Sequence, residues 1–439
     1  MRVQFWTMQF GRGYSQGTER YLTLLRSGLA AAGVETQVWA ADPENRANRN
    51  YTLGQEIDCD TNLRAVPSHG WPTIFGIDES RISPLIEDFA PDVVHILNPG
   101  FVGVGVLAAA RRLGIATVAS VVDYWWLCPK HTLQHFRGGI CDAVVSWREC
   151  LACISAERPR SVRRVIAHLP ILRDLALPPA YALRWLANGV PVRELLRWPR
   201  RQQHLLSELD ACDAVIFLSQ AARGRIGERL MRTSKRVIRN GLASEWFREP
   251  PAQPESVTVR PPESLTLGFA GALAPHKGPQ VLLRALRELG WTRTRLRLAG
   301  TAENEEFLAG LRDLARGLNV EFVGRVNTPE MPAFYRALDA LIVPSTWLEN
   351  LPMVVLEARA SRTPVLASDV PGISEFVPAA RRFAAGDATA LAACLERWRR
   401  GEANDDGPAT PRVEEMIGAT LEVYRDVLAR RGEASAARR

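Results

Sequence analysis

The sequence lacks an apolar run long enough to cross a membrane. A membrane-spanning helix needs about 18 or more consecutive apolar residues, whereas the stretch FVGVGVLAAA ends at Arg111. The residues after Met1, RVQFWTMQFGRG, contain no sustained apolar stretch of the kind that forms a secretory signal. These absences argue against a membrane-spanning or secreted protein, and we expect a cytoplasmic one.

The sequence also lacks a regular dinucleotide-binding fingerprint. The strand-like run RVQFW is followed by a glycine-rich loop and a helical stretch ending at Gly33, the position where such a fingerprint belongs. The glycines are spaced Gly11-x-Gly13-x-x-x-Gly17, one residue longer than G-x-G-x-x-G. This spacing disfavours a dehydrogenase. A flexible turn is the alternative interpretation of this glycine-rich loop.

What is present indicates two α/β domains. The 439 residues are 46% hydrophobic and 23% charged, and single cores seldom exceed about 250 to 300 residues. Short β-branched runs alternate with helical stretches on both sides of a segment rich in Pro and Ser, which predicts two doubly wound parallel sheets. We expect a first domain at 1–241 with a Cys- and Arg-rich insertion at about 124–205, a linker at 242–263, and a second domain at 264–410.

The last segment, 411–439, is predicted to be an amphipathic helix with a short tail. Its apolar residues recur at helical spacing, which predicts one buried stripe made of Met416, Ile417, Leu421, Tyr424 and Leu428.

The stretch from Pro344 to Glu375 carries the strongest signal for a ligand site. An apolar strand ends at Pro344, a polar loop carries Glu349, and a helix carrying Glu357 precedes the next strand, PVLAS. We expect this helix to start near Asn350, with Asn350 as its cap and Pro352 in its first turn. Unpaired amides at a helix start favour anions. The alternative is an ordinary amphipathic helix with one solvated glutamate.

This stretch, with its pattern PS-x-x-x-EN-x-P-x-x-x-LEA followed by PV-x-AS-x-x-x-G-x-x-E, resembles the retaining glycosyltransferases of family 4. The resemblance implies the GT-B fold, in which two Rossmann-like domains face each other and a C-terminal helix crosses back onto the first. It implies transfer of a sugar from a UDP- or GDP-sugar donor to a glycan or lipid-linked acceptor, as in polysaccharide biosynthesis.

The resemblance also implies roles for individual residues. Lys277 would lie against the diphosphate, Glu349 would contact the transferred sugar, and Glu357 would accept hydrogen bonds from the ribose. Asp123 falls in a segment that the family places beside the reacting centre. The remaining donor-binding positions implied in this way are Gly17, Gly271, Gly324, Asn350 and Leu351.

Two positions depart from the family's pattern. Ala272 stands where the family usually has an arginine, and Val122 stands where it commonly has a histidine before Asp123. His276 or Arg325 could replace the missing cation, and His131 could replace the missing histidine. These departures leave open a second function, a catalytically silent GT-B protein that binds a sugar nucleotide or a protein partner.

The mechanism implied by the resemblance retains the anomeric configuration through attack on the same face. The leaving phosphate oxygen would accept the acceptor's proton, so neither a catalytic metal nor another cofactor would be required. The expected partners are the nucleotide-sugar donor and the acceptor.

Four of the seven cysteines form a cluster with the pattern C-x12-C-x8-C-x2-C, made of Cys128, Cys141, Cys150 and Cys153. In a reducing compartment such a cluster more often binds metal than forms disulfides. A structural zinc, an iron–sulfur centre and free or partly paired thiols are the three interpretations. The resemblance places this cluster in a subset of the family.

The positive charge of the chain is concentrated in one segment. Between Ala156 and Leu205 there are ten arginines and three acidic residues, a net charge of +7 that equals the charge of the whole chain. Arg alternates there with Leu, Ile and Trp, which suits an anionic membrane surface at the inner face of a membrane. Nucleic acid is disfavoured because aliphatic residues dominate the segment. Helices packed on the first domain with a solvated Arg face are the alternative.

Overall fold

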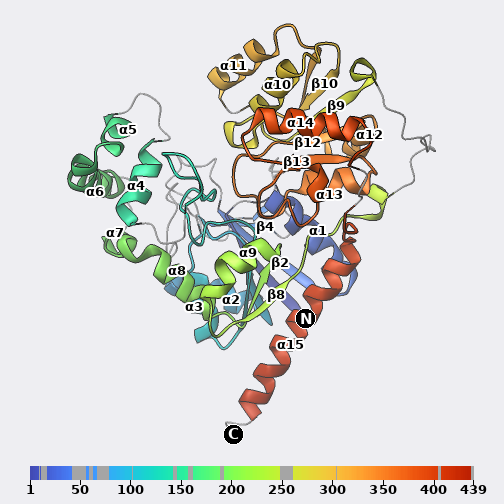
Figure 1. Cartoon of the computed structure of the whole chain (residues 1–439). Helices are drawn as coiled ribbons and strands as arrows, with labels where there is room; N and C mark the ends of the chain where they lie inside the picture. The colour runs from blue at the N-terminus through green and yellow to red at the C-terminus, as the bar shows by residue number, and fades with distance from the viewer. Residues whose placement is uncertain are drawn as a thin grey trace. The chain divides into compact units, whose positions relative to one another are not determined.

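The computed structural model forms two compact units. Unit 1 comprises Met1–Arg239 and Met416–Arg439, and unit 2 comprises Asn240–Glu415 (Figure 1). The structure describes residues 1–8, 10, 17–41, 56–58, 63–66, 79–100, 102–141, 146–156, 162–187, 192–247, 261–302, 304–403 and 407–436. Most of the expected linker lies outside these residues.

Unit 1 contains an eight-stranded sheet with the order β3-β4-β2-β1-β5-β6-β7-β8. All neighbours pair in parallel except β3 and β4. Strands β5 and β6 are buried along their whole length, as expected of apolar, β-branched runs covered on both faces. The strands are β1 (Arg2–Thr7), β2 (Glu35–Ala41), β3 (Glu56–Asp58), β4 (Leu63–Val66), β5 (Val93–Ile96), β6 (Ala116–Val121), β7 (Ala214–Phe217) and β8 (Ser234–Val237).

Helices accompany this sheet, and a group of them follows β6 as an insertion. The first group is α1 (Gly17–Ala31), α2 (Glu79–Phe89), α3 (Gly105–Arg112), α8 (Arg201–Asp210) and α9 (Gln220–Ile226). The insertion contains α4 (Trp147–Ala156), α5 (Val162–Ala167), α6 (Pro170–Ala187) and α7 (Val192–Arg197), which pack against one another. Among the described residues, no helix is both long enough and apolar enough to span a membrane.

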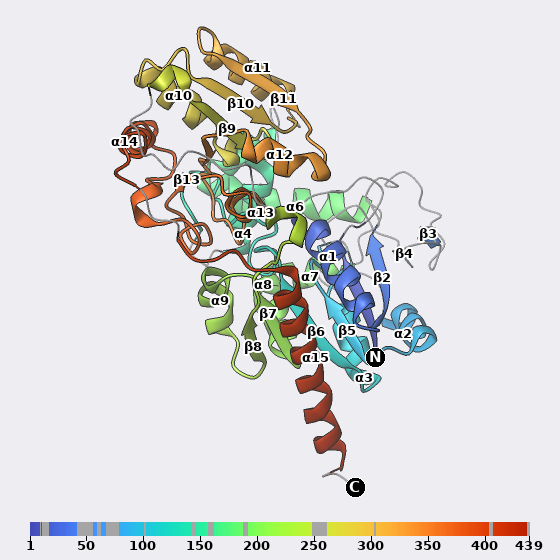
Figure 2. The same cartoon turned by 90° about the vertical axis from the view of Figure 1, so that its right-hand side faces the viewer.

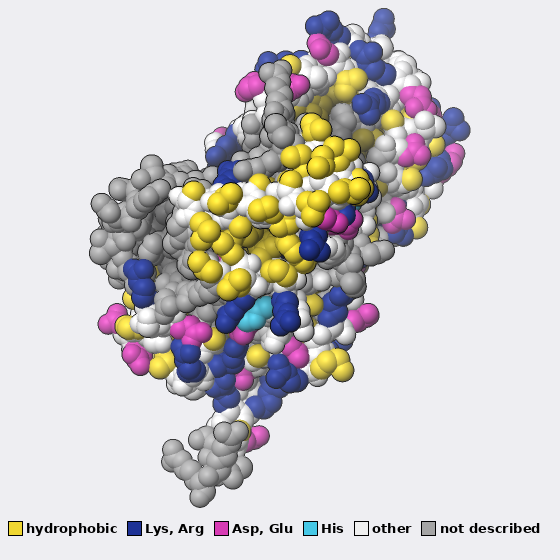
Figure 3. Space-filling view, turned by 90° about the vertical axis from the view of Figure 1, so that its left-hand side faces the viewer, with side chains coloured by type: hydrophobic (Ala, Val, Ile, Leu, Met, Phe, Trp, Pro, Cys, Tyr) yellow, Lys and Arg dark blue, Asp and Glu magenta, His cyan; other side chains and the backbone are white. Residues whose placement is uncertain are grey.

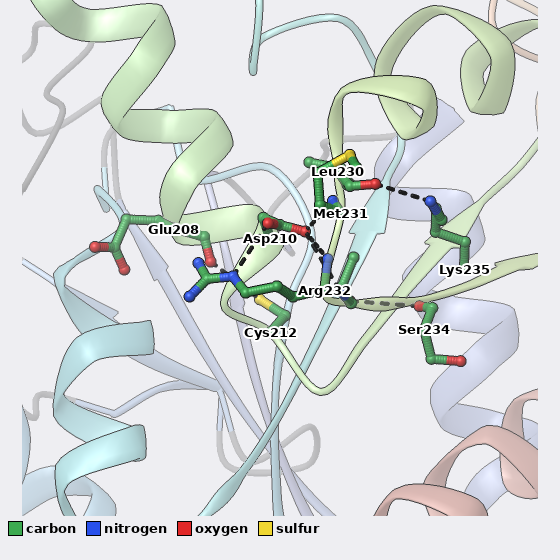
Figure 4. A network of polar contacts seen from close by, with 9 residues as sticks. Glu208, Asp210, Cys212, Leu230, Met231, Arg232, Ser234 and Lys235 are labelled. Carbon is green, nitrogen blue, oxygen red and sulfur yellow. Dashed lines mark hydrogen bonds and ion pairs between the residues drawn. The ribbon is translucent and has the colours of Figure 1, made fainter.

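A polar network joins the end of α8 to the loop before β8 (Figure 4). One carboxylate oxygen of Asp210 accepts hydrogen bonds from the amides of Met231, Arg232 and Thr233 at 2.7, 2.8 and 3.3 Å. Burial would raise the pKa of Asp210, but these amides and the Arg232 guanidinium outweigh it and lower the pKa. The network is a structural connection between neighbouring strands β7 and β8.

The final helix, α15 (Val413–Ala436), packs on unit 1 from Met416 onward (Figure 2). The Tyr424 hydroxyl lies 2.6 Å from Nδ1 of the buried His95, and Nε2 of His95 lies 2.8 Å from the Ser120 hydroxyl. Arg431 forms two 2.9 Å bonds with Asp213. The predicted stripe is confirmed: Met416, Ile417, Leu421 and Tyr424 are buried and Leu428 is half-buried.

Unit 2 contains a parallel six-stranded sheet with the order β11-β10-β9-β12-β13-β14. Its strands are β9 (Thr266–Ala270), β10 (Arg295–Ala299), β11 (Val320–Gly324), β12 (Ala340–Val343), β13 (Val365–Ser368) and β14 (Arg382–Phe383). Its helices are α10 (Pro279–Glu288), α11 (Glu305–Ala315), α12 (Met331–Arg336), α13 (Met353–Ala360) and α14 (Ala388–Arg399). Aliphatic residues of β9, β10 and α10 form the core.

In each sheet, the chain places strands first on one side of the first strand and then on the other side. The change of side falls between β1 and β5 in unit 1 and between β9 and β12 in unit 2. The predicted doubly wound α/β class is therefore confirmed. Loops that follow the strands at such a switch point diverge from each other, so ligands commonly bind there.

One local prediction is wrong. The helix that carries Glu357 begins at Met353, and its N-cap is Pro352, which has an extended backbone (φ −73°, ψ 114°). Asn350 therefore does not cap the helix, and Pro352 precedes its first turn. The physical reason is the proline, because it disfavours a helical conformation at Leu351 before it.

Candidate functional site

The switch point of unit 2 brings together two loops that are far apart in the sequence. Lys277 follows β9 and Glu349 follows β12, and these strands are neighbours that run in parallel. The Lys277 ammonium lies 2.8 Å from Glu349 Oε1, forming an ion pair between residues 72 positions apart. The structure thus joins two of the residues to which the resemblance gave roles in donor binding.

Glu349 is buried and held by three donors. Besides Lys277, the Ser345 hydroxyl and the Trp347 indole N–H donate to Oε1 at 2.8 and 2.7 Å. Burial would raise the pKa of Glu349, but the charge of Lys277 and the three hydrogen bonds outweigh it and lower the pKa. Glu349 is therefore a fixed carboxylate at neutral pH.

Lys277 keeps part of its side chain in solvent, with 26% of it exposed. Its ammonium lies 4.6 Å from the centre of the Trp347 ring, and the centre of the His276 ring lies 4.7 Å from the centre of the same ring. Gly278 makes this turn feasible: its φ is +76°, and a Cβ there would lie 1.9 Å from the carbonyl oxygen of Pro344. An ammonium held this way can donate further N–H bonds to an anion.

Glu357 is fully buried in α13 and receives a 2.8 Å hydrogen bond from the Tyr335 hydroxyl of α12. The loop between Glu349 and α13 is also enclosed, since Asn350 and Leu351 are buried. Gly372 packs against this loop so closely that a Cβ would lie 2.3 Å from the Glu349 carbonyl oxygen. The chain around both carboxylates is thus tightly fixed.

Glycines end three neighbouring strands of the same sheet. Gly271 follows β9 with φ +141°, Gly324 ends β11 with φ +76°, and Gly300 lies between them after β10. Gly300 donates its amide to the Gly324 carbonyl at 2.8 Å, and a Cβ on it would lie 1.8 Å from the Gly271 carbonyl oxygen. The predicted positions Gly271 and Gly324 therefore share one sheet edge with Lys277.

The structure separates the two candidate substitutes for the missing arginine at Ala272. His276 belongs to the Lys277 loop and contacts Trp347. Arg325 follows β11, which lies two strands away from β9. His276 is therefore the candidate that adjoins the ion pair.

Unit 1 has its own polar cluster at the ends of β5 and β6. Asp123 accepts the Trp125 amide at 2.8 Å through Oδ1, and its Oδ2 lies 3.0 Å from Nδ1 of His131. Asn98 donates its side-chain amide to the same Oδ2. Val122 leaves no histidine directly before Asp123, but His131 reaches that carboxylate from the following loop. Gly17 is the first residue of α1, and Gly11 and Gly13 lie outside the described residues.

The four clustered cysteines lie around one cavity of about 190 Å³. None of the four forms a disulfide. Burial, together with the neighbouring thiols, raises the pKa of Cys141 to about 11 and that of Cys150 to about 12. Among the described residues, no group of three or more His, Cys, Asp or Glu side chains is arranged to hold a metal ion. Zinc at Cys128, Cys141, Cys150 and Cys153 therefore stays a prediction from the sequence.

Arg201 is one of the residues that line this cavity. Its guanidinium donates to the Trp125 carbonyl at 2.7 Å and lies 4.5 Å from the Trp125 ring. Burial lowers its pKa to about 10, against the opposing influence of Cys128, Cys150 and Asp123. The cysteine cavity and the Asp123 cluster are thus joined through Trp125.

Sequence reasoning did not find four residues that shape these clusters. They are Ser345 and Trp347 beside Glu349, Tyr335 beside Glu357, and Asn98 beside Asp123. Ser345 and Trp347 could have been found, because they lie only four and two residues before Glu349 in the same loop. Tyr335 and Asn98 had no local signal, since each is 22 or more positions from its partner.

Comparison with protein families agrees with this geometry. The family described as Glycosyltransferase Family 4 matches residues 15–246, more than half of the chain. The chain belongs to glycosyltransferase family 4. A second family, Glycosyl transferases group 1, matches residues 264–399 of this family 4 protein.

Curated relatives match the family 4 chain only in part. The lipopolysaccharide 1,2-N-acetylglucosaminetransferase of Salmonella typhimurium is 31% identical over 182 residues, which cover 39% of this chain and 48% of that protein. The D-inositol 3-phosphate glycosyltransferase of Kineococcus radiotolerans is 39% identical over 133 residues, 27% of this chain and 29% of that protein. The chain spans about half or less of the length of these relatives.

A solved structure matches the whole family 4 chain. The HepE protein of Anabaena, crystallised in complex with UDP, aligns over 100% of both chains with a TM-score of 0.58 and 14% sequence identity. This likeness concerns the fold, and it confirms the predicted GT-B class.

Proposed function

We propose that this protein transfers a sugar from a UDP- or GDP-sugar to a glycan or lipid-linked acceptor, with retention of the anomeric configuration. The observation that carries the proposal is the Lys277–Glu349 ion pair at the switch point of unit 2. A fixed carboxylate beside a partly exposed ammonium offers separate partners for a sugar hydroxyl and for a diphosphate.

The site residues of unit 2 have separate roles in this proposal. Lys277 stabilises the negative charge that develops on the departing diphosphate, and Glu349 positions the sugar. Glu357, held by Tyr335 at 2.8 Å, accepts hydrogen bonds from the ribose. The amides at the start of α13 and the backbone at Gly271 and Gly324 bind the rest of the nucleotide. HepE was crystallised with UDP, which supports a nucleotide of this kind.

The reaction needs no protein base in this scheme. The bond between the sugar's anomeric carbon and the diphosphate oxygen breaks, and a bond to the acceptor oxygen forms on the same face. The acceptor's proton moves to the leaving phosphate oxygen, so the nucleoside diphosphate departs with it. We propose that Asp123 and His131 orient the sugar and the acceptor, and that no metal ion takes part.

A catalytically silent protein that binds a sugar nucleotide or a protein partner is the alternative function, and Val122 and Ala272 are the observations that favour it. Both kinds of protein would bind the donor, but only the transferase would turn it over. A silent protein would bind the nucleotide sugar and release no nucleoside diphosphate.

The test has two steps. Thermal unfolding in the presence of UDP, GDP and their sugars identifies the donor, because a ligand at 100 times its Kd stabilises the folded state by about 2.7 kcal/mol. Nuclear magnetic resonance of the product formed from that donor then reports the anomeric configuration. No stabilisation by any nucleotide sugar would refute donor binding, and an inverted product would refute the proposed mechanism.

A further inference from the structure

The helical insertion of unit 1 exposes an unusually apolar face. Figure 3 shows hydrophobic side chains gathered there, with Lys and Arg side chains along the lower border of the patch. Ile171 and Leu196 are 75% exposed, and Leu175 and Leu183 are 70% exposed. We call this surface the α5–α7 face; its exposed aliphatic residues are Val165, Leu169, Ile171, Leu172, Leu175, Leu183, Leu186, Val192 and Leu196.

Helix α6 contributes two apolar stripes on opposite sides. Leu177, Tyr181 and Trp185 are spaced four residues apart and are buried against the rest of unit 1. The exposed residues Leu172, Leu175, Leu183 and Leu186 fall within roughly 80° of one another at 3.6 residues per turn, on the side opposite the buried stripe.

A surface helix normally needs one apolar stripe to bind its own core. The buried stripe of α6 already fulfils this requirement, because the Tyr181 hydroxyl accepts a 3.0 Å bond from Ser155 and the Trp185 ring packs against Trp198 at 4.8 Å. The second stripe therefore has no role in holding the helix within the described part of unit 1. A contiguous apolar patch of this kind marks a contact surface.

Exposed arginines lie on segments that adjoin the helices of this face. Arg148 is on α4, which packs against α5 and α6, and Arg200 follows α7. The acidic residues Glu149 and Asp174 are bound by Arg173 at 3.3 and 2.8 Å, which compensates part of their negative charge. The segment from Ala156 to Leu205 carries a net charge of +7. The occupant of this face should accordingly be both apolar and anionic.

We propose that the α5–α7 face docks on an anionic lipid bilayer. Its leucine stripe enters the boundary between headgroups and acyl chains, and the neighbouring arginines contact the anionic headgroups. The helices lie on the membrane, in agreement with the absence of a spanning helix among the described residues.

The composition of the face favours lipid over a protein partner. Contact surfaces between proteins are enriched in Tyr, Trp and Met, whereas the exposed large apolar residues here are Leu, Ile and Val. This inference rests on the proposed function in one respect: docking would bring the enzyme to a lipid-linked acceptor. Binding to lipid itself is independent of sugar transfer.

The experiment measures sedimentation of the full chain with vesicles of zwitterionic lipid alone and with vesicles that also contain an anionic phospholipid. We expect binding to the anionic vesicles that weakens as salt is added. Replacing Leu175→Glu and Leu183→Glu together should weaken binding at least about tenfold, because two leucines leave the apolar phase. Arg148→Gln and Arg200→Gln should each weaken it about fivefold.

Two matched controls lie elsewhere on unit 1. Met231→Glu places a single glutamate at an 84% exposed apolar residue, and Arg223→Gln removes an exposed arginine from α9. Both should bind vesicles as the parent protein does. Thermal unfolding and donor hydrolysis without lipid should be unchanged in the leucine variant, so a failure of docking is distinguishable from a failure of the proposed transferase.

Three outcomes would overturn the proposal. The first is parent protein that stays in the supernatant with anionic vesicles. The second is equal binding by the leucine variant and by Met231→Glu. The third is a parent protein that self-associates without lipid while the leucine variant is monomeric, as measured by light scattering. The face would then bind a second copy of the chain.

Discussion

Glu349 depends on Lys277 to compensate its buried negative charge. Glu349 is 5% exposed, and removing its cation would leave a buried carboxylate that Ser345 and Trp347 still hold but no positive charge compensates. Such a loss commonly costs several kcal/mol of stability. The pair therefore combines a structural role in unit 2 with the role proposed in donor binding.

The first prediction concerns Lys277. Replacing Lys277→Met should reduce kcat for sugar transfer by about 100-fold, because one preorganised donor to the leaving diphosphate is lost. Lys277→Arg keeps the charge and should retain more activity than Lys277→Met. Steady-state assays of nucleoside diphosphate release check both variants. Full activity of Lys277→Met would remove Lys277 from the mechanism.

The second prediction concerns His131. Its Nδ1 lies 3.0 Å from Asp123, where it can replace the histidine missing at position 122. His131→Phe should lower kcat by about 100-fold, because a side chain proposed to orient the sugar and the acceptor is lost. His168→Phe, at an exposed histidine of the insertion, is the control and should leave kcat unchanged. Equal rates for the two variants would show that His131 has no catalytic part.

At the scale of elements, the turn between β9 and α10 determines where Lys277 lies. Gly278 combines a positive φ with an approach to Pro344 that excludes any Cβ. The third prediction is that Gly278→Ala lowers the free energy of unfolding by at least about 2 kcal/mol. Urea denaturation measures the change.

A matched glycine provides the control for this variant. Gly310 lies in α11 with nothing near its Cβ position, so Gly310→Ala should raise the free energy of unfolding by about 1 kcal/mol. If both alanine variants changed stability in the same direction, the turn at Gly278 would not be under the constraint described.

Helix α15 is attached to unit 1 through His95. Burial lowers the pKa of His95 from 6.5 to about 3. Between these values the unfolded chain binds a proton that the folded protein does not, so stability falls as pH falls, by up to about 1.4 kcal/mol per pH unit. Above pH 6.5 both states are neutral at this residue, and its contribution is fully present.

The fourth prediction follows from this difference. His95→Gln cannot take up the proton and should show a shallower loss of melting temperature between pH 6.5 and pH 3. Tyr424→Phe should reduce stability by about 1 to 3 kcal/mol at neutral pH, because His95 loses a partner 2.6 Å away. Parallel pH profiles for His95→Gln and the parent protein would contradict the role of His95.

At the scale of the whole molecule, the fifth prediction is its metal content. If the sequence interpretation of the cysteine cluster holds, purified protein contains about one equivalent of zinc, and Cys128→Ser with Cys153→Ser removes it. Cys394→Ser, at a buried cysteine of unit 2, is the control and should retain the metal. Elemental analysis that finds less than about half an equivalent of zinc or iron would remove the hypothesis.

The organisation of the molecule was largely predictable from local pattern. Alternating β-branched and helical runs predicted two doubly wound sheets, and the stripe of α15 was identified from its spacing. Local rules failed at the start of α13, where Pro352 moved the first helical residue to Met353. The edge strand β3 and the two-residue β14 were not predicted, because such short segments carry no periodic signal.

The sequence by itself determined the family 4 motif, the order of the elements and the identities of Lys277, Asp123, Glu349 and Glu357. Only the tertiary structure decided which of these residues meet. Neighbouring parallel strands β9 and β12 are far apart in the chain, so their pairing alone joins Lys277 to Glu349. Packing likewise decided which stripe of α6 is exposed. The helix carries two apolar stripes, and the fold buries one of them and leaves the other in solvent.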